Sequence, residues 1–337
     1  MVVLGIESSC DECAASIVED GRIIHSNVIA TQLDLHQPYQ GVVPEIASRL
    51  HTEWIQSVAM QSLDEAGMTV GDLDAAAASN RPGLVGSLLV GLSFVKGLAF
   101  SLDIPFIGVD HVRAHLYAPH LEQDIPYPYL GLLVSGGHTV ISIVRGFDDI
   151  EVLGTTIDDA CGEAFDKVAK FYHFGYPGGI AIDKLAKNGD PKAFNFPSAN
   201  LHKGNHDYDF SYSGLKTAAV NQLDQFWNRD YEKTPENIAA SFQKRAIAML
   251  VKKLKKAIKD TGINRVVAGG GVSANSYLRE ELTKLYQVET YYPSLLLCTD
   301  NAAMIAGIAY QYLKRGDRDD LSLNASARVP SFKRRYP

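Results

Sequence analysis

The sequence predicts a two-domain α/β protein built around a duplicated β-hairpin. Three observations support this fold class. The 337 residues exceed the size at which one hydrophobic core usually stops growing. Strand-like runs alternate with helical ones, which is typical of a sheet covered by helices. Finally, the segment from Leu4 to Ile24 aligns without a gap on a later one, so that Gly5 falls on Gly131 and Ser16 on Ser142.

Each hairpin copy consists of an apolar run, a turn of small residues and a second strand-like run. The other elements follow from hydrophobic periodicity and turn residues. Helices are expected at residues 53–66, 84–102, 162–172, 235–261, 274–285 and 300–314, and strands at 74–79 and 265–268. The 84–102 helix is apolar nearly all round, which predicts tight burial against a sheet. Residues 188–212 are expected to form a long ordered loop whose aromatic side chains pack in the core or stack on RNA bases.

The composition is that of a soluble globular protein, with 46% hydrophobic and 21% charged residues. We see no basic leader or cleavage site, and the longest apolar stretch, residues 84–95, is too short to span a bilayer and ends at Lys96. We therefore expect a cytoplasmic protein without a membrane partner. The net charge of −7 disfavours indiscriminate coating of nucleic acid. Seven lysines and arginines nevertheless gather at residues 244–259, either as a solvated helix face or as an RNA contact.

Two histidines four residues apart, His111 and His115, are the first candidate metal ligands. On a helix both rings leave one face, with a rise of about 6 Å between them, which suits two ligands of one ion. Asp300 can supply an oxygen ligand, although a role as helix N-cap also explains it. A zinc protease of this motif type places Glu after the first His. Val112 occupies that position and cannot accept a proton, so a bound metal more plausibly polarises a carbonyl.

The second hairpin carries the strongest anion-loop candidate. Gly136 and Gly137 follow a strand, and consecutive backbone N–H groups there can form a nest for phosphate or carboxylate. The counterpart in the first hairpin is Ser8-Ser9-Cys10-Asp11, with Glu7 and Glu12 as neighbouring acids. Asp183 follows another glycine turn, where it binds ribose or faces solvent. Cys10 and Cys13 lack the second cysteine pair that a structural zinc site needs.

Taken together, these motifs resemble the tRNA adenosine threonylcarbamoyltransferase family, and they keep their order across nearly the whole chain. The matching motifs are Gly5-Ile6-Glu7-Ser8-Ser9-Cys10-Asp11-Glu12, Gly41-Val42-Val43-Pro44-Glu45, His111-x-x-x-His115, Val134 to Thr139, Gly162 to Lys167, Gly175 to Gly179, Ser213 to Thr217, Gly269 to Asn275 and Cys298 to Asn301. The resemblance implies the actin-like, sugar-kinase-like and Hsp70-like ATPase (ASKHA) fold, with residues 1–122 and 296–337 as the first domain and 123–295 as the second.

The activity that the resemblance implies is transfer of a threonylcarbamoyl group from threonylcarbamoyl-AMP to the N6 amine of the adenosine just 3′ of the anticodon, in tRNAs that read codons beginning with A. It further implies that His111, His115 and Asp300 bind one Fe²⁺ or Zn²⁺ ion, and that Asp11 or Glu12 assists proton removal from the amine. The adenine nucleotide, with ATP or ADP as alternatives, would occupy a cleft. Its implied contacts are Val134, Ser135, Gly136, Gly137, His138, Asp166, Gly179, Asp183 and Asn275.

The resemblance also implies partners: tRNA, a catalytically inert paralogue that pairs through the first domain, and a P-loop ATPase. The sequence departs from the family pattern at Arg81, Arg113 and Cys13, none of which removes an implied ligand. Arg81 is expected to alter packing or a cleft wall. A zinc metalloprotease, disfavoured by Val112, and an actin-like ATPase or scaffold paralogue remain the alternative functions.

Overall fold

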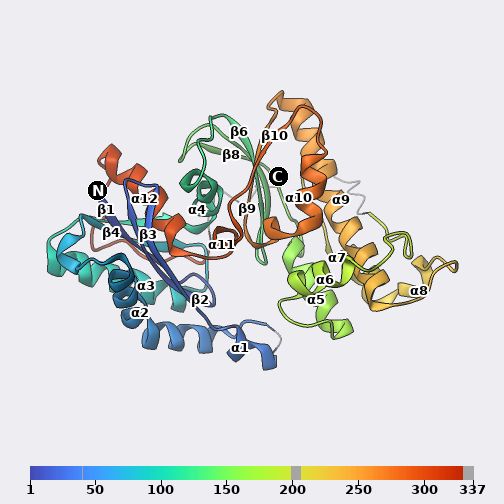
Figure 1. Ribbon diagram of the computed structural model, residues 1–337, viewed down its shortest axis with the longest axis horizontal. Helices are drawn as coiled ribbons and strands as arrows, with labels where there is room; N and C mark the ends of the chain where they lie inside the picture. The colour runs from blue at the N-terminus through green and yellow to red at the C-terminus, as the bar shows by residue number, and fades with distance from the viewer. Residues whose placement is uncertain (40, 199–205, 329–337) are drawn as a thin grey trace. The chain divides into compact units, whose positions relative to one another are not determined.

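The computed structural model describes residues 1–39, 41–198 and 206–328, and it divides into two compact units. Unit 1 comprises Met1–Ile125 and Pro293–Pro330, and unit 2 contains Pro126–Tyr292. Each unit has its own five-stranded mixed sheet and its own hydrophobic core (Figure 1). The predicted α/β class with two mixed sheets is therefore confirmed.

Unit 1 is built on the sheet order β3-β2-β1-β4-β5. Helices α2 and α3 cover one face of this sheet, and α12 packs on β1 from the other (Figure 1). At Gly5 a β-carbon would come within 2.5 Å of the Ala302 carbonyl oxygen, so glycine permits the close approach of α12. The strands are β1 (Val2–Glu7), β2 (Glu12–Glu19), β3 (Ile23–Thr31), β4 (Ala75–Arg81) and β5 (Phe106–Asp110), and the helices are α1 (Leu33–His36), α2 (Pro44–Ala66), α3 (Val85–Leu102), α4 (His111–Tyr117), α11 (Leu295–Cys298) and α12 (Ala302–Arg315).

Unit 2 is built on the sheet order β10-β9-β6-β7-β8. Its longest helix is α9, which packs against α6 and α10 (Figure 1). The strands are β6 (Tyr129–Val134), β7 (Thr139–Val144), β8 (Ile150–Thr155), β9 (Arg265–Gly269) and β10 (Glu289–Tyr291), and the helices are α5 (Cys161–Tyr172), α6 (Gly178–Ala186), α7 (Ser213–Asn221), α8 (Leu223–Phe226), α9 (Pro235–Thr261) and α10 (Ser276–Thr283).

The two hairpins pair in the same register, which confirms the duplication. In the first, Leu4 lies opposite Ile17 and Gly5 opposite Ser16. In the second, Leu130 lies opposite Ile143 and Gly131 opposite Ser142. In each unit, the strand beside the first hairpin strand is parallel to it: β4 beside β1 and β9 beside β6. The ungapped sequence alignment is thus also a structural one.

Helix α3 differs from its prediction of tight burial. Its inner face packs on β4 and α2, whereas Val85, Leu89 and Phe100 on its outer face are exposed, Phe100 by 76%. The helix continues to Leu102, as expected, and Lys96 lies inside it with its ammonium donating to the carbonyl of Leu321 (2.9 Å). The expectation that this apolar segment is too short to span a bilayer was therefore wrong. In the described part of the chain, α3 is the one helix long and apolar enough to cross a membrane by length and composition, a test that core helices also pass.

The segment after α6 is largely a core-packing loop. Phe194, Phe196, Phe210 and Tyr212 are all at most 3% exposed and belong to the core of unit 2. This confirms core packing for these aromatic side chains. The middle of the expected loop, residues 199–205, and the basic C-terminal residues Lys333, Arg334 and Arg335 lie outside the described residues.

Candidate metal centre and anion loop

Helix α4 places His111 and His115 on one face, as their spacing predicts. The helix begins directly after β5, and Asp110 caps it by accepting hydrogen bonds from the backbone N–H groups of Val112 (3.0 Å) and Arg113 (3.2 Å). Such capping satisfies two backbone donors that have no partner within the helix. Both imidazoles are buried, and their rings meet edge to face with centroids 4.5 Å apart.

Asp300 reaches the two histidines from the turn between α11 and α12. The expected alternative, that Asp300 caps the last helix, is wrong. Helix α12 begins at Ala302, and its cap is Asn301, whose side chain accepts a hydrogen bond from the Met304 N–H (3.0 Å). Because the neighbouring residue serves as the cap, the Asp300 carboxylate is directed to the imidazoles instead.

The three side chains present a ligand set for one metal ion. The Nε2 atoms of His115 and His111 lie 3.1 and 3.6 Å from Oδ1 of Asp300, and all three ligand atoms fall within 4.8 Å of one another. Two ligands of a tetrahedral ion, each about 2.1 Å from it, stand roughly 3.4 Å apart. Two imidazoles and one carboxylate also suit zinc and ferrous iron. The residues therefore fit a borderline divalent cation, and three protein ligands leave a position for substrate.

Glu7 is the residue of this site whose role sequence reasoning missed. It is fully buried at the end of β1, and its Oε2 lies 2.9 Å from Nδ1 of His111. Its Oε1 accepts hydrogen bonds from the Ser9 N–H (2.6 Å) and the Ser79 hydroxyl (3.0 Å). This contact leaves Nε2 of His111 directed at Asp300. The sequence placed Glu7 beside the first loop, but only the fold brings it to a histidine more than 100 positions away.

The carboxylates make this site favourable for positive charge. Burial by itself lowers the pKa of His111, but Glu7 and Asp300 outweigh it and raise that pKa to about 9. Burial and the neighbouring His111 lower the pKa of His115. The carboxylates thus favour a positive charge at His111, the charge that a bound metal ion would supply in place of a proton. The buried carboxylate of Glu7 and the partly buried carboxylate of Asp300 both contact the imidazoles and favour a cation at this site, which a divalent metal would supply.

The three departures from the family pattern leave these ligands in place. Arg81 lies at the end of β4 with its Nε 3.6 Å from Oδ2 of Asp110, the cap of α4. Arg113 donates to the Tyr312 hydroxyl (3.2 Å) and so joins α4 to α12. Cys13 is fully buried, and burial raises the pKa of its thiol to about 12.

Of the expected proton acceptors, Asp11 ends the turn between β1 and β2, and Glu12 is the first residue of β2. Both are partly buried. Burial raises the pKa of Glu12 well above its usual range, and the charge of Asp300 raises it further. Glu12 is therefore close enough to Asp300 for the two carboxylates to interact. A carboxyl group with a raised pKa is a stronger base than an exposed one.

The loop from Ser135 to His138 is a tight turn with two exposed glycines. Its ends are joined by hydrogen bonds from the Ser135 N–H to the His138 carbonyl (2.8 Å) and from the His138 N–H to the Ser135 hydroxyl (3.1 Å). A β-carbon on Gly136 or Gly137 would meet nothing within 4 Å. The backbone of these two glycines is thus open to a ligand, as the nest interpretation requires. Val134 ends β6 and is fully buried.

The other expected nucleotide contacts lie in α5 and α6 and at the N-terminus of α10, in the same unit. Asp166 accepts a hydrogen bond from the Gly178 N–H (2.8 Å). A β-carbon on Gly179 would meet nothing within 4 Å, so the space beside this glycine is open. Asp183 accepts from the Ser276 hydroxyl (2.8 Å). Asn275 caps α10 through Leu278 N–H (2.9 Å) and donates to Gln243 (3.0 Å), so its amide already has a structural role.

The candidate residues therefore form two groups. The metal ligands, Glu7, Asp11 and Glu12 belong to unit 1, and the glycine loop with its four neighbours belongs to unit 2. Each unit carries the hairpin-led mixed sheet that defines the ASKHA class of two-domain α/β proteins. Solved structures agree with this class. The chain resembles HypF from T. kodakarensis (TM-score 0.62, 13% identity, 93% of this chain and 48% of that chain) and the (R)-2-hydroxyglutaryl-CoA dehydratase component A from Acidaminococcus fermentans (0.55, 15%, 93% and 99%).

Comparison of the sequence with known proteins gives the family. Residues 23–307 match the model of the tRNA N6-adenosine threonylcarbamoyltransferase family. A protein of that name from Treponema denticola is 64% identical over 99% of both chains, and one from Borreliella burgdorferi is 53% identical over all of this chain and 96% of its own. The chain belongs to the tRNA N6-adenosine threonylcarbamoyltransferase family.

Proposed function

We propose that this chain transfers a threonylcarbamoyl group from threonylcarbamoyl-AMP to the N6 amine of the adenosine 3′ of the anticodon in tRNAs that read codons beginning with A. Family membership over the whole chain supports the reaction. The observation that carries the site assignment is the cluster of two buried histidines, His111 and His115, with the partly buried Asp300, whose ligand atoms fit one ion.

We assign the carbamoyl end of the substrate to the metal centre. A bound Fe²⁺ or Zn²⁺ ion would orient this end and withdraw charge from its carbonyl as a Lewis acid. Glu7 holds His111 so that Nε2 is presented to the ion, and Asp110 fixes the start of the helix that carries both imidazoles. Val112 is fully buried and offers no base, so the geometry gives no support to hydrolysis by the zinc-protease route.

The glycine loop is assigned to the phosphate of the adenylate. The backbone N–H groups of Gly136 and Gly137 would donate hydrogen bonds to this phosphate, and to the phosphate of AMP as it departs. Asp183, near Ser276, and Gly179 would contact the ribose and base side of the nucleotide. Glu12 or Asp11 would take the proton from the attacking amine, and the raised pKa of Glu12 favours the former.

Family membership and one exposed surface of unit 1 support the proposed partners of this chain. An inert paralogue would pair through the exposed apolar stripe of α3, formed by Val85, Leu89 and Phe100, with Met60 of α2 also exposed. A P-loop ATPase and tRNA complete the proposed assembly, and we place the reaction in the cytoplasm. Exposed apolar side chains aligned on a helix are typical of a surface that a protein partner covers.

The test is mass spectrometry of tRNA nucleosides after incubation of the chain with threonylcarbamoyl-AMP, unmodified tRNA and its partner subunits. We expect threonylcarbamoyladenosine with the native chain and none with His111→Ala/His115→Ala. Elemental analysis should show one metal ion per chain in the former and none in the latter. Equal product formation by the double variant would refute the metal assignment.

A further inference from the structure

We propose that the outer face of α9, together with the pocket at its N-terminal half, is a binding surface for the RNA backbone of the tRNA and for one unpaired nucleotide. This inference rests on the proposed function, because it concerns how the tRNA is held. It concerns unit 2, whereas the candidate metal ligands belong to unit 1, and it uses residues to which the transfer chemistry assigns no role.

The first observation behind this proposal is a set of four lysines on one side of α9, here called the α9 stripe: Lys244, Lys252, Lys255 and Lys259. At 3.6 residues per turn they fall within an arc of about 80°, and they span about 22 Å of helix. All four are exposed. Ala248, exposed and small, lies in the same row between the first two. Together the four lysines form a positive edge along one side of the helix.

The stripe lysines differ from their neighbours in having no partner among residues 1–39, 41–198 and 206–328. No hydrogen bond or ion pair engages any of the four. The other two lysines of the helix have partners. Lys253 donates to the carbonyls of His206 and Asp207 (both 2.9 Å). Lys256 forms ion pairs with Asp260 (2.8 Å) and Asp207 (3.5 Å). Asp207 and Asp260 are thus paired with a lysine outside the stripe, which leaves the stripe's charge available to a ligand.

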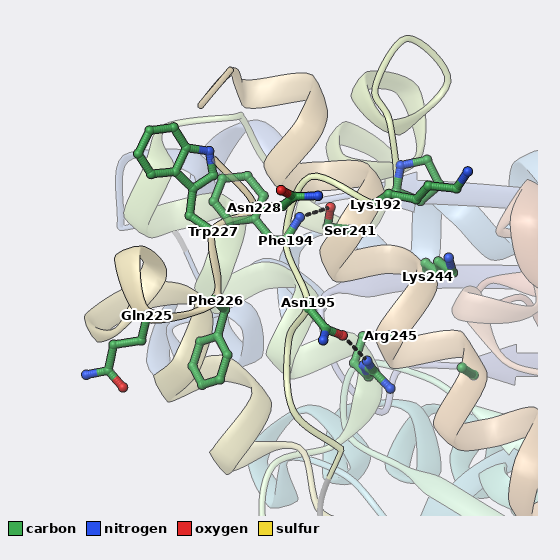
Figure 2. A pocket seen from close by; sticks show the side chains of 12 residues that line it. Lys192, Phe194, Asn195, Gln225, Phe226, Trp227, Asn228, Ser241, Lys244 and Arg245 are labelled. Atoms are coloured by element: carbon green, nitrogen blue, oxygen red, sulfur yellow. Dashed lines mark hydrogen bonds between the residues drawn. The ribbon is translucent and has the colours of Figure 1, made fainter. Parts of the chain in front are cut away.

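A pocket of about 730 Å³ opens at the Lys244 end of the stripe. Figure 2 shows Lys244 and Arg245 of α9 on one side, Phe226 and Trp227 on the opposite side, and Asn195 between them. Arg245 donates to the Asn195 amide oxygen (3.1 Å), so its guanidinium is fixed beside the opening. The Trp227 ring already lies against Arg229 and Lys233 (4.4 and 4.3 Å), and Phe194, which also lines the pocket, is only 3% exposed. Phe226 is therefore the aromatic wall that a ligand can stack on.

This combination suits RNA better than a small anion or an acidic peptide. A row of unpaired lysines tracks a phosphodiester backbone, and an aromatic wall with amide groups accepts an unstacked base. The size of the pocket lies within the range of small-ligand sites and accommodates a nucleotide. The whole chain carries a net charge of −7, so a polyanion is repelled by most of the protein and attracted to a local positive face such as this one.

The test compares two variants of equal charge in the full chain with its partner subunits. The first changes the α9 stripe, Lys244, Lys252, Lys255 and Lys259, to Gln. The matched control changes four exposed lysines on other elements, Lys170, Lys184, Lys187 and Lys284, to Gln. We measure binding of an unmodified tRNA transcript at several salt concentrations, and formation of threonylcarbamoyladenosine at saturating tRNA.

The stripe variant should bind tRNA at least about tenfold more weakly near 0.1 M salt, with a slope of log K against log salt that is smaller by about 3. The control should stay within about twofold. Product formation at saturating tRNA should be retained, because the chemistry lies elsewhere. Unchanged tRNA affinity of the stripe variant, or an equal loss in the control, overturns the inference. Absence of product from the native chain with all partners would instead refute the proposed function.

The pocket is tested separately with Phe226→Leu, which keeps an apolar side chain against Phe196 but removes the stacking ring. The affinity for tRNA should fall about tenfold while the salt slope stays unchanged. Thermal unfolding checks that the fold is intact. A native affinity in a folded Phe226→Leu protein would remove the nucleotide pocket from the proposal and leave the lysine stripe alone.

Discussion

At the residue scale, the main finding is that a buried carboxylate orients one of the candidate metal ligands. Glu7 contacts the Nδ1 atom of His111, and this leaves the opposite ring nitrogen for a cation. Ligating histidines commonly donate their second nitrogen to such a group, which fixes the ring and increases its basicity. Glu7 is thus a positioning residue that acts through His111.

Glu7→Gln keeps the size of the side chain and removes its charge. We expect the affinity for Zn²⁺ to fall about 10- to 100-fold, measured by competition with a chelator. The control is Glu19→Gln, which removes the same charge from a second pair, His25 and Glu19 (2.8 Å). Equal metal retention in the two variants would contradict the role assigned to Glu7.

A second residue-scale prediction concerns acid sensitivity. Burial, reinforced by Arg22, lowers the pKa of His120 to about 4. Between pH 6.5 and 4 the unfolded chain therefore binds more protons at this residue than the folded chain does. The contribution of neutral His120 to the free energy of unfolding is fully present above pH 6.5. It decreases by up to about 3 kcal/mol as the pH falls toward 4.

His120→Phe, which keeps a ring beside Tyr117 (centroids 5.1 Å apart in the native chain), should reduce this loss. Urea unfolding at pH 7, 5.5 and 4.5 measures the effect for both proteins. The free energy of unfolding should fall less steeply in the variant as the pH decreases. Parallel pH curves would show that His120 does not contribute.

At the element scale, the contact between the start of α5 and the glycine loop determines the shape of the anion site. Gly162 is the second residue of α5, and a β-carbon there would lie 2.6 Å from the Ser135 carbonyl oxygen and 2.9 Å from Gly136 Cα. Both are backbone atoms, so the loop would have to move. The Gly162 N–H also donates to the Ser135 carbonyl (3.2 Å).

Gly162→Ala should therefore displace the loop and weaken binding of the adenylate by about tenfold or more, measured by calorimetry with a non-reactive analogue. Gly214→Ala is the matched control. Gly214 is also the second residue of a helix, α7, but a β-carbon there meets nothing within 4 Å. We expect the control to bind normally and to gain up to about 1 kcal/mol of stability. Normal binding by both variants would disprove the loop assignment.

At the scale of the whole molecule, the two units divide the proposed tasks. Residues Pro126–Tyr292 are contiguous and carry the glycine loop and the α9 stripe, whereas all three candidate metal ligands come from the two segments of unit 1. Unit 2 also has its own hydrophobic core. A segment with its own core and continuous chain can in principle fold alone.

A fragment of residues 126–292 should thus unfold cooperatively in urea, bind the adenylate analogue weakly and retain no stoichiometric metal. Circular dichroism, calorimetry and elemental analysis measure the three properties, with the full chain as reference. A fragment that retains one metal ion per chain would place the metal site outside unit 1 and contradict the ligand assignment.

The sequence by itself determined the α/β class, the duplication, the α4 histidine pair and the glycine loop, because each depends on residues close together along the chain. The same local patterns predicted the span of α9 from Pro235 to Thr261. Tertiary structure alone decided that Asn301 caps α12 and leaves Asp300 to the imidazoles, that Glu7 holds His111, and that the outer face of α3 stays exposed. These features depend on contacts between distant segments. Periodicity specifies which side of a helix is apolar, but only packing determines what that side meets.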